Sequence, residues 1–295
     1  MIKSKNIFVC IGAIHYDYLL NLKKNIINFR TNPIIHKSRI GGVAYNVAEI
    51  ISIFEKVQFY SLKISKELKK SITNKISIKQ INNNESSRYY IAISNKNNNF
   101  LLGLANTDVY EANKYFKIPK IKNKLIIYDL NFSKNFIENT IKEFSYKNKI
   151  IVCGTSIHKI YKIKKILKHI DILFLNKSEL MQLTKTKNII NEIKKIQNIN
   201  NKIKIIATNS KNNVIYANNK KIIKIKPPKI KIKNENGAGD ALAGMMLFLL
   251  SRKYSEDIIL KYSVACGSYY ASGKKLKIKK DLIKIKELSK KVIIR

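Results

Sequence analysis

Short apolar runs alternate with amphipathic stretches through the middle of the chain. Runs typical of buried β-strands occur at Leu125–Tyr128, Lys149–Cys153, Ile172–Leu175 and Ile203–Thr208. Between these runs, apolar residues recur at helical spacing over residues 134–145, 157–168 and 188–199. Because parallel strands need a crossover connection, which is usually a helix, the alternation predicts a central, mostly parallel sheet flanked by helices.

The N-terminal part of the chain contains fewer such signals. Apolar runs at residues 7–11 and Val57–Leu62 indicate two more buried strands. An apolar stripe at helical spacing begins directly after Gly41-Gly42 and predicts a helix. Residues 88–104 contain two apolar runs around an Asn-rich turn, which is typical of a β-hairpin. Residues 14–40 are mixed and polar, and their pattern alone predicts no element.

The C-terminal third has a mainly helical pattern. An antiparallel strand pair is expected at Val214–Ala217 and Ile222–Ile225, before a Pro-Pro pair. Helices are expected at residues 238–252, 255–272 and 279–291. The chain shows no internal repeat and no linker rich in Gly or Pro. We therefore expect residues 1–295 to form a single α/β domain.

The formal net charge of +39 raises the question of a nucleic-acid or membrane partner. However, 53 of the 58 basic residues are Lys, and they are spread along the whole chain. Nucleic-acid sites favour Arg, because its fork binds phosphate and guanine with two hydrogen bonds. We interpret the charge as a solvated basic surface that attracts small anions, and we expect no nucleic-acid partner.

The cysteines and the apolar runs indicate a soluble protein of a reducing compartment. Cys10, Cys153 and Cys266 lie in apolar stretches and have neither metal-ligand nor disulfide-framework spacing. The N-terminus lacks the apolar region and cleavage site of a signal peptide. The most apolar run, Ala241–Leu250, is too short to cross a bilayer. We expect a cytoplasmic protein without a membrane partner.

The motif with the clearest chemistry is Asn236-Gly237-Ala238-Gly239-Asp240, which directly precedes an apolar helix. Two glycines let backbone amides approach an anion closely, and the positive end of the helix dipole points to the same place. A carboxylate in an anion site is unusual, but Asp240 there can take the proton of a hydroxyl that attacks a phosphate. The amides of Gly237, Ala238 and Gly239 would then stabilise the charge on the transferred group. A plain turn with a capping Asp is the structural alternative.

A second glycine-led helix start lies near the N-terminus. Gly41 and Gly42 open the helix, and Asn46 follows one turn later. Backbone amides and an amide side chain at this position can bind hydroxyl groups. On its own, a glycine pair before a helix is a common capping arrangement.

Together, these motifs resemble the two signatures of the ribokinase-like (PfkB) kinases, a GG-x₃-N helix start and a GAGD helix start. The resemblance covers almost the whole chain. It implies a three-layer α/β fold and a small β-sheet lid from about residues 13–40 and 86–106. It also implies transfer of phosphate from ATP to a hydroxyl of a sugar or nucleoside. A homodimer formed through the lid is an additional hypothesis.

The resemblance assigns further site residues. Asp17, in the segment after the first strand, resembles the Asp that holds sugar hydroxyls, together with Gly41, Gly42 and Asn46. Asn176-Lys177-Ser178-Glu179 matches an N-x-x-E element, which implies that Asn176 and Glu179 organise Mg²⁺ through water. The turn at residues 208–213 corresponds to the adenine region, which implies that Thr208 and Ser210 contact ATP.

Three segments depart from the family pattern. Asn234-Glu235-Asn236 replaces the usual Asp-Thr before GAGD, so support for a monovalent-cation site is weak. Residues 62–65 lack a VGxD-like element, and the turn at 208–213 lacks its glycine. Since Asn tolerates positive φ, an Asn in that turn is expected to replace the glycine.

Two segments are similar to pseudouridine kinases in particular. They are GVAYNVAE at Gly42–Glu49 and LGLANTDVYE at Leu102–Glu111. The resemblance therefore implies phosphorylation of the 5′-hydroxyl of pseudouridine. Another acceptor of the same family, such as ribose, fructose or adenosine, stays open. A decayed kinase that only binds, or a basic nucleic-acid-binding protein, is the alternative from a different class.

Overall fold

In the computed structural model, residues 7–85, 88–97, 99–111, 117–184, 188–278 and 280–295 are described. Within them, ten strands form a large sheet in the order β14-β13-β12-β11-β10-β9-β8-β1-β4-β5. All neighbouring pairs from β11 to β5 are parallel, whereas β12, β13 and β14 add antiparallel neighbours. The predicted mostly parallel α/β sheet is therefore confirmed. The strands are β1 (Phe8–Ile11), β4 (Val57–Lys63), β5 (Ile76–Glu85), β8 (Leu125–Tyr128), β9 (Lys149–Cys153), β10 (Ile172–Asn176), β11 (Lys204–Thr208), β12 (Val214–Ala217), β13 (Ile222–Lys226) and β14 (Ile293–Ile294).

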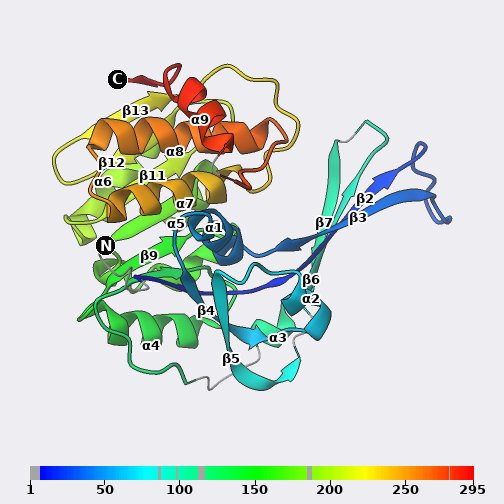
Figure 1. Cartoon of the computed structure of the whole chain (residues 1–295), viewed down its shortest axis with the longest axis horizontal. Coiled ribbons are helices and arrows are strands. Elements are labelled where there is room, and N and C mark those ends of the chain that lie inside the picture. The colour runs from blue at the N-terminus through cyan, green and yellow to red at the C-terminus, as the bar shows by residue number, and fades with distance from the viewer. Residues whose placement is uncertain (1–6, 86–87, 98, 112–116, 185–187, 279) are drawn as a thin grey trace.

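Helices cover both faces of this sheet and make two hydrophobic cores (Figure 1). The strands are apolar on both faces, so successive side chains enter different cores: Phe8 and Cys10 enter one, and Val9 and Ile11 the other. The helices over the first core are α1 (Val43–Ser52), α2 (Lys66–Lys70), α7 (Ala238–Ser251), α8 (Glu256–Ala271) and α9 (Asp281–Ser289). Those over the second are α3 (Asp108–Glu111), α4 (Lys134–Ser145), α5 (Lys177–Thr184) and α6 (Ile189–Ile199).

Four further strands form a separate small sheet in the order β3-β2-β6-β7, again within the described residues. They are β2 (His15–Leu22), β3 (Ile34–Gly41), β6 (Tyr89–Ser94) and β7 (Phe100–Ala105). The small sheet projects from the large sheet and its helices (Figure 1). The expected hairpin at 88–104 is confirmed as the antiparallel pair β6–β7. Residues 14–40, whose pattern predicted no element, contain β2 and β3. Residues 86, 87 and 98 of the expected lid lie outside the described part.

One predicted helix, at residues 157–168, is wrong. This segment forms two 3₁₀ turns, η1 (Ile160–Ile163) and η2 (Leu167–His169), with backbone bonds from residue i to i−3 such as Lys162 to Lys159. Its buried residues Ile160, Ile163 and Ile166 recur every three positions, which suits the three-residue repeat of a 3₁₀ turn. The other predicted helices are confirmed within a few residues at their ends; residue 279 lies outside the described part.

Candidate active site

The carboxyl ends of the parallel strands meet at one edge of the large sheet. Asp129 follows β8, Asn176 ends β10, and Thr208 ends β11. The register pairs Asn176 with Thr208 on the neighbouring strand. Open parallel sheets bind their ligands at this edge, so the fold brings together Asn176 and Thr208, which were predicted from the sequence, and Asp129, which was not.

The two glycine-led helix starts meet through one hydrogen bond. Asn46 Nδ2 in α1 donates to Asp240 Oδ2 in α7 at 2.7 Å, across 194 residues of sequence. α1 and α7 also pack closely, because Gly244 of α7 lies against Ile50 and the backbone of Val47. The two motifs are therefore in direct contact in the structure.

The environment of Asp240 raises its pKa to about 6, from an ordinary value of 3.8. Burial is the main cause, and the charges of Asp129 and Asp17 act in the same direction. The hydrogen bond from Asn46 and the charge of Arg39 oppose this shift. A carboxyl with a pKa near 6 is ionised at neutral pH and still basic enough to take a proton.

The start of α7 has the features of an anion hole. Gly237 adopts φ +83° as the N-cap residue, which favours glycine. Within the described residues, the amides of Gly237 and Gly239 form no hydrogen bond, while that of Ala238 donates to Glu235 O at 3.1 Å. A Cβ added at Gly239 would meet no atom within 4 Å. Open space thus lies beside free amides at the positive end of a helix.

A cavity of about 70 Å³ lies beside the starts of α1 and α7. Asn46 and Gly237 line it, together with three basic residues, Arg39, Lys274 and Lys275. Positive side chains beside an anion hole strengthen its attraction for phosphate groups.

Asp17 lies on β2, and it is 5% exposed. Its Oδ2 accepts a hydrogen bond from Arg39 Nε on β3 at 3.2 Å. Its Oδ1 lies 3.1 Å from Nδ1 of His15, but outside hydrogen-bond geometry, so it accepts no bond from the described residues. A buried oxygen with a free lone pair suits a hydroxyl of a bound ligand. Gly41 leaves the room for this carboxylate, because a side chain there would overlap Asp17.

The sequence reading missed Asp129, which is fully buried. Its Oδ2 accepts from the amides of Ala13 at 3.0 Å and Ala44 at 3.3 Å, and its Oδ1 accepts from Asn131 at 2.9 Å. Asp129 thereby fixes the turn after β1 against the start of α1. An Asp directly after a buried strand, at the ligand-binding edge, is the signal that could have identified it.

Asn176 and Glu179 form a reciprocal cap at the start of α5. Glu179 Oε2 accepts from the Asn176 amide, and Asn176 Oδ1 accepts from the Glu179 amide, both at 2.9 Å. Glu179 is 3% exposed, and burial is the main reason that its pKa rises to about 7. The charge of Asp240 adds to this rise, so the two carboxylates are near one another.

Thr208 is the last residue of β11, and Ser210 lies in the turn that follows. In this turn the residue with positive φ is Ser210, at +50°. The expectation that an Asn adopts the positive φ is therefore wrong. Ser210 Oγ donates to Glu235 Oε1 at 2.6 Å and joins this turn to the segment before the anion hole. The hydroxyl bond to Glu235 offsets a backbone conformation that Ser rarely adopts.

A second group of charged residues lies near Asp129. Lys162 is 1% exposed and donates to Glu111 and to the carbonyls of Leu130 and Phe132. Lys159 donates to Asn131 Oδ1 at 2.8 Å, and burial lowers its pKa to about 8. The sequence reading identified neither lysine, because both lie in the segment predicted as an amphipathic helix.

A parallel α/β sheet with a helix-borne anion hole, and with a carboxylate beside it, is the arrangement of an α/β phosphotransferase. The sequence pattern of the pfkB family carbohydrate kinases matches residues 8–277. The chain therefore belongs to this family, whose members are phosphotransferases that use alcohol groups as acceptors. No curated protein matches the chain in sequence.

Solved structures share the whole fold at low identity. A carbohydrate kinase from Agrobacterium tumefaciens has a TM-score of 0.77 at 18% identity, over 98% of this chain and 99% of its own. A nucleoside kinase from Methanocaldococcus jannaschii gives 0.74 at 16%, over 96% and 99%. A ribokinase from Cryptococcus neoformans, solved with ADP, gives 0.75 at 15%, over 96% and 99%. The ribokinase-like fold is confirmed. Among the described helices, none is long and apolar enough to cross a membrane.

Proposed function

We propose that this protein is an ATP-dependent kinase that phosphorylates the 5′-hydroxyl of pseudouridine. The observation that carries the kinase assignment is the 2.7 Å hydrogen bond between Asn46 and Asp240. It joins the helix start at Gly41-Gly42, where the acceptor would bind, to the anion hole at the start of α7. The acceptor itself rests on the similarity of Gly42–Glu49 and Leu102–Glu111 to pseudouridine kinases. The alternative is another acceptor of the same family, such as ribose or another nucleoside. The structural similarity to a nucleoside kinase and to a ribokinase fits this alternative as well as it fits pseudouridine.

The ribose binds between Asp17 and Asn46 in this mechanism. Asp17 Oδ1 accepts from ribose hydroxyls, and the glycine pair Gly41-Gly42 lets the ring approach the start of α1. Asp240 takes the proton of the 5′-hydroxyl as that oxygen attacks the γ-phosphorus of ATP, the bond from the γ-phosphorus to the β–γ bridging oxygen breaks, and ADP leaves. The free amides of Gly237 and Gly239 stabilise the charge on the transferred phosphoryl group.

Arg39 has two roles in this arrangement. Its bond to Asp17 orients the carboxylate that holds the ribose, and its charge keeps Asp240 ionised. It also lines the cavity beside the anion hole, where a guanidinium attracts phosphate oxygens.

ATP and Mg²⁺ complete the proposed site. Thr208 and Ser210 contact the nucleotide from the end of β11 and the turn after it. The charge of Asp240 raises the pKa of Glu179, because two nearby carboxylates repel each other. A bound cation would relieve this repulsion. No group of three or more metal-ligating side chains occurs in the described part of the chain, so Mg²⁺ would be held through water and phosphate oxygens. When bound, Mg²⁺ neutralises phosphate charge.

We propose that residues 1–295 form one kinase domain with the small sheet as its lid. The register places Arg39, Asp17 and Tyr90 in one row across β3, β2 and β6, so all three share the face of the small sheet that bears Asp17. Tyr90 lies over Gly103, where a Cβ would come 2.6 Å from its hydroxyl oxygen. Tyr90 is half-buried, and the accessible part of its ring supplies a stacking surface for the nucleobase.

The test is competition between pseudouridine and uridine at equal concentration with ATP and Mg²⁺, followed by chromatography of the products. We expect pseudouridine 5′-phosphate to dominate. A preference for uridine or free ribose would refute pseudouridine and leave the kinase assignment intact. Absence of transfer to any sugar or nucleoside hydroxyl would refute both. The Asp240→Asn variant, purified in parallel, controls for contaminating kinases.

A further inference from the structure

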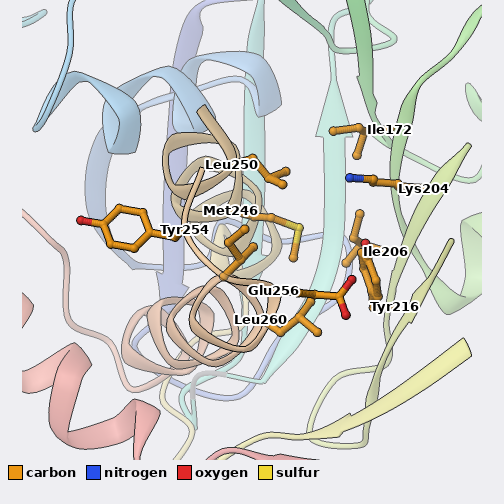
Figure 2. A pocket seen from close by; sticks show the side chains of 10 residues that line it. Ile172, Lys204, Ile206, Tyr216, Met246, Leu250, Tyr254, Glu256 and Leu260 are labelled. Carbon is orange, nitrogen blue, oxygen red and sulfur yellow. The ribbon is translucent and has the colours of Figure 1, made fainter. Parts of the chain in front are cut away.

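A cavity of about 210 Å³ lies between the large sheet and the α7–α8 pair (Figure 2). The strands β10, β11 and β12 form one wall, and the end of α7 and the beginning of α8 form the other. Asp240 stands at the opposite end of α7, a helix of 14 residues and therefore about 20 Å long. The cavity is thus separate from the proposed sites for acceptor and ATP.

Most of the lining is apolar. Ile206, Met246 and Leu260 are each 1% exposed and close the inner end of the cavity. An engineered cavity of about 150 Å³ with similar walls binds benzene, whereas sites for drug-sized ligands begin at about 300 Å³. The present volume therefore suits one ring or one branched aliphatic group.

Lys204 is an unusual residue at this position. The register pairs it with Ile172, and it shares a strand face with Ile206, so it faces the core under α7 where apolar residues are the rule. Figure 2 shows its amino group extending from the sheet toward α7, between Ile172 and Ile206. Within the described residues, Lys204 forms no ion pair and its amino group no hydrogen bond.

The other charge of the cavity is already matched. Glu256 Oε1 lies 2.6 Å from Lys221 Nζ, and its Oε2 accepts from Asn218 Nδ2 at 3.4 Å. This pair leaves the amino group of Lys204 as the charge available to a ligand. A buried or half-buried ammonium gains most from an anionic partner that brings its own apolar body.

We propose that this cavity is a second ligand site, which takes a small organic carboxylate with one ring or one branched aliphatic group. The apolar part fills the space between Ile206, Met246 and Leu260. The carboxylate accepts hydrogen bonds from Lys204 at the outer end.

The experiment is calorimetric titration of the protein with phenylacetate, without ATP or nucleoside, so that its result does not depend on kinase activity. Phenylacetate has about ten non-hydrogen atoms, and for a ligand of this size we expect saturable binding with a Kd in the millimolar range or tighter. Lys204→Met keeps the length of the side chain and removes its charge, and we expect affinity to fall about tenfold or more. Lys224→Met, on an exposed position of β13, is the matched control and should bind like the wild type.

Two further arms locate the ligand. The neutral isostere phenylacetamide should bind more weakly than phenylacetate to the wild type, and equally to the wild type and Lys204→Met. Leu250→Phe fills the cavity from its partly buried wall and should abolish binding. Unsaturable binding in the wild type, an unchanged affinity in Lys204→Met, or full binding in Leu250→Phe would each overturn the proposal. Thermal unfolding of each variant shows that it is folded.

Discussion

Asp240 is held between opposing influences at the scale of a single residue. Burial and the neighbouring carboxylates favour its neutral form, whereas Asn46 and Arg39 favour its charge. The sequence identified Asp240 and Asn46, because each follows a glycine-led helix start. It did not assign roles to Arg39 or Asp129, because Arg39 acts through its pairing with Asp17 on the neighbouring strand, and Asp129 acts through the distant amides of Ala13 and Ala44.

Replacement of Asp240 tests its role as the general base. Asp240→Asn keeps the shape and can still accept from Asn46, but it cannot take a proton. We expect turnover to fall about 10²–10⁴-fold at saturating acceptor, with ATP affinity little changed. Asp257→Asn, at an exposed position in α8, is the control. Turnover within a few-fold of the wild type would exclude Asp240 as the base.

The same substitution should stabilise the fold in a defined pH window. Since the pKa of Asp240 is raised in the folded state, its ionisation costs stability above pH 6, and this cost vanishes below about pH 3.8. The shift corresponds to at most about 3 kcal/mol. We therefore expect Asp240→Asn to unfold at a higher temperature than the wild type at pH 8 and at the same temperature at pH 3.5. Equal melting temperatures at pH 8 would show that the carboxyl is not strained. In the wild type, kcat/KM should fall as pH drops through 6.

Tyr90 and Tyr89 offer a matched pair on opposite faces of the small sheet. Tyr90 shares a row with Asp17, whereas the neighbouring Tyr89 points to the other face and is 40% exposed. Stacking on a base is worth about 1–3 kcal/mol, so Tyr90→Leu should raise the KM for a nucleoside about tenfold. The KM of Tyr90→Leu for free ribose should equal that of the wild type. Tyr89→Leu should have wild-type KM values for both nucleoside and ribose. An equal effect on ribose and nucleoside would place Tyr90 away from the base.

Helices and strands differ in how well the sequence specified them. α1, α7 and the central strands were predicted because apolar residues recur with the period of each element. β2 and β3 were not predicted, because much of their length is half-exposed or exposed. Their charged, polar and apolar residues do not alternate regularly. Residues 157–168 were wrongly predicted as an α-helix, because a three-residue repeat of apolar residues resembles a helical stripe over so short a length. In addition, Lys162 is buried, whereas the sequence suggested a solvent-exposed lysine.

The two glycines at the start of α7 can be separated by experiment. A Cβ at Gly239 meets open space, so Gly239→Ala should fold with near wild-type stability yet hinder phosphate binding. Gly237 has φ +83°, so Gly237→Ala should cost about 1 kcal/mol or more of stability by backbone strain. The measurements are thermal unfolding and the KM for ATP. A destabilised Gly239→Ala with normal ATP binding would indicate a purely structural turn.

At the scale of the whole molecule, composition and fold carry different information. The charge of +39 suggested a polyanion partner, but the fold and the family place the chain among small-molecule kinases. The mostly parallel sheet flanked by helices could be predicted from the alternation of strand and helix patterns along the chain. The acceptor could not be fixed in this way, because it depends on how the small sheet is placed over the site and on side chains from four strands.

The small sheet has a face, opposite the one that bears Asp17, that carries several exposed apolar side chains. Beyond Tyr16, which packs against the first core, the face opposite Asp17 contains Tyr18, Ile91, Leu102 and Leu104, of which the last two are 49% and 46% exposed. A contiguous apolar face of this kind is typical of an interface. The charge of +39 on each copy opposes association, and salt screens this repulsion.

We therefore predict a homodimer through the small sheet whose association strengthens as salt rises. Leu104→Glu places a charge in the middle of the apolar face and should give a monomer in sedimentation experiments at 0.3 M salt. Tyr146→Glu changes an 81% exposed residue after α4, far from the small sheet in sequence and fold, and should leave the dimer intact. A wild-type monomer at every concentration and salt would refute the dimer. A dimer that persists in Leu104→Glu would place the interface on another surface, because a buried unpaired carboxylate costs more than such an interface can supply.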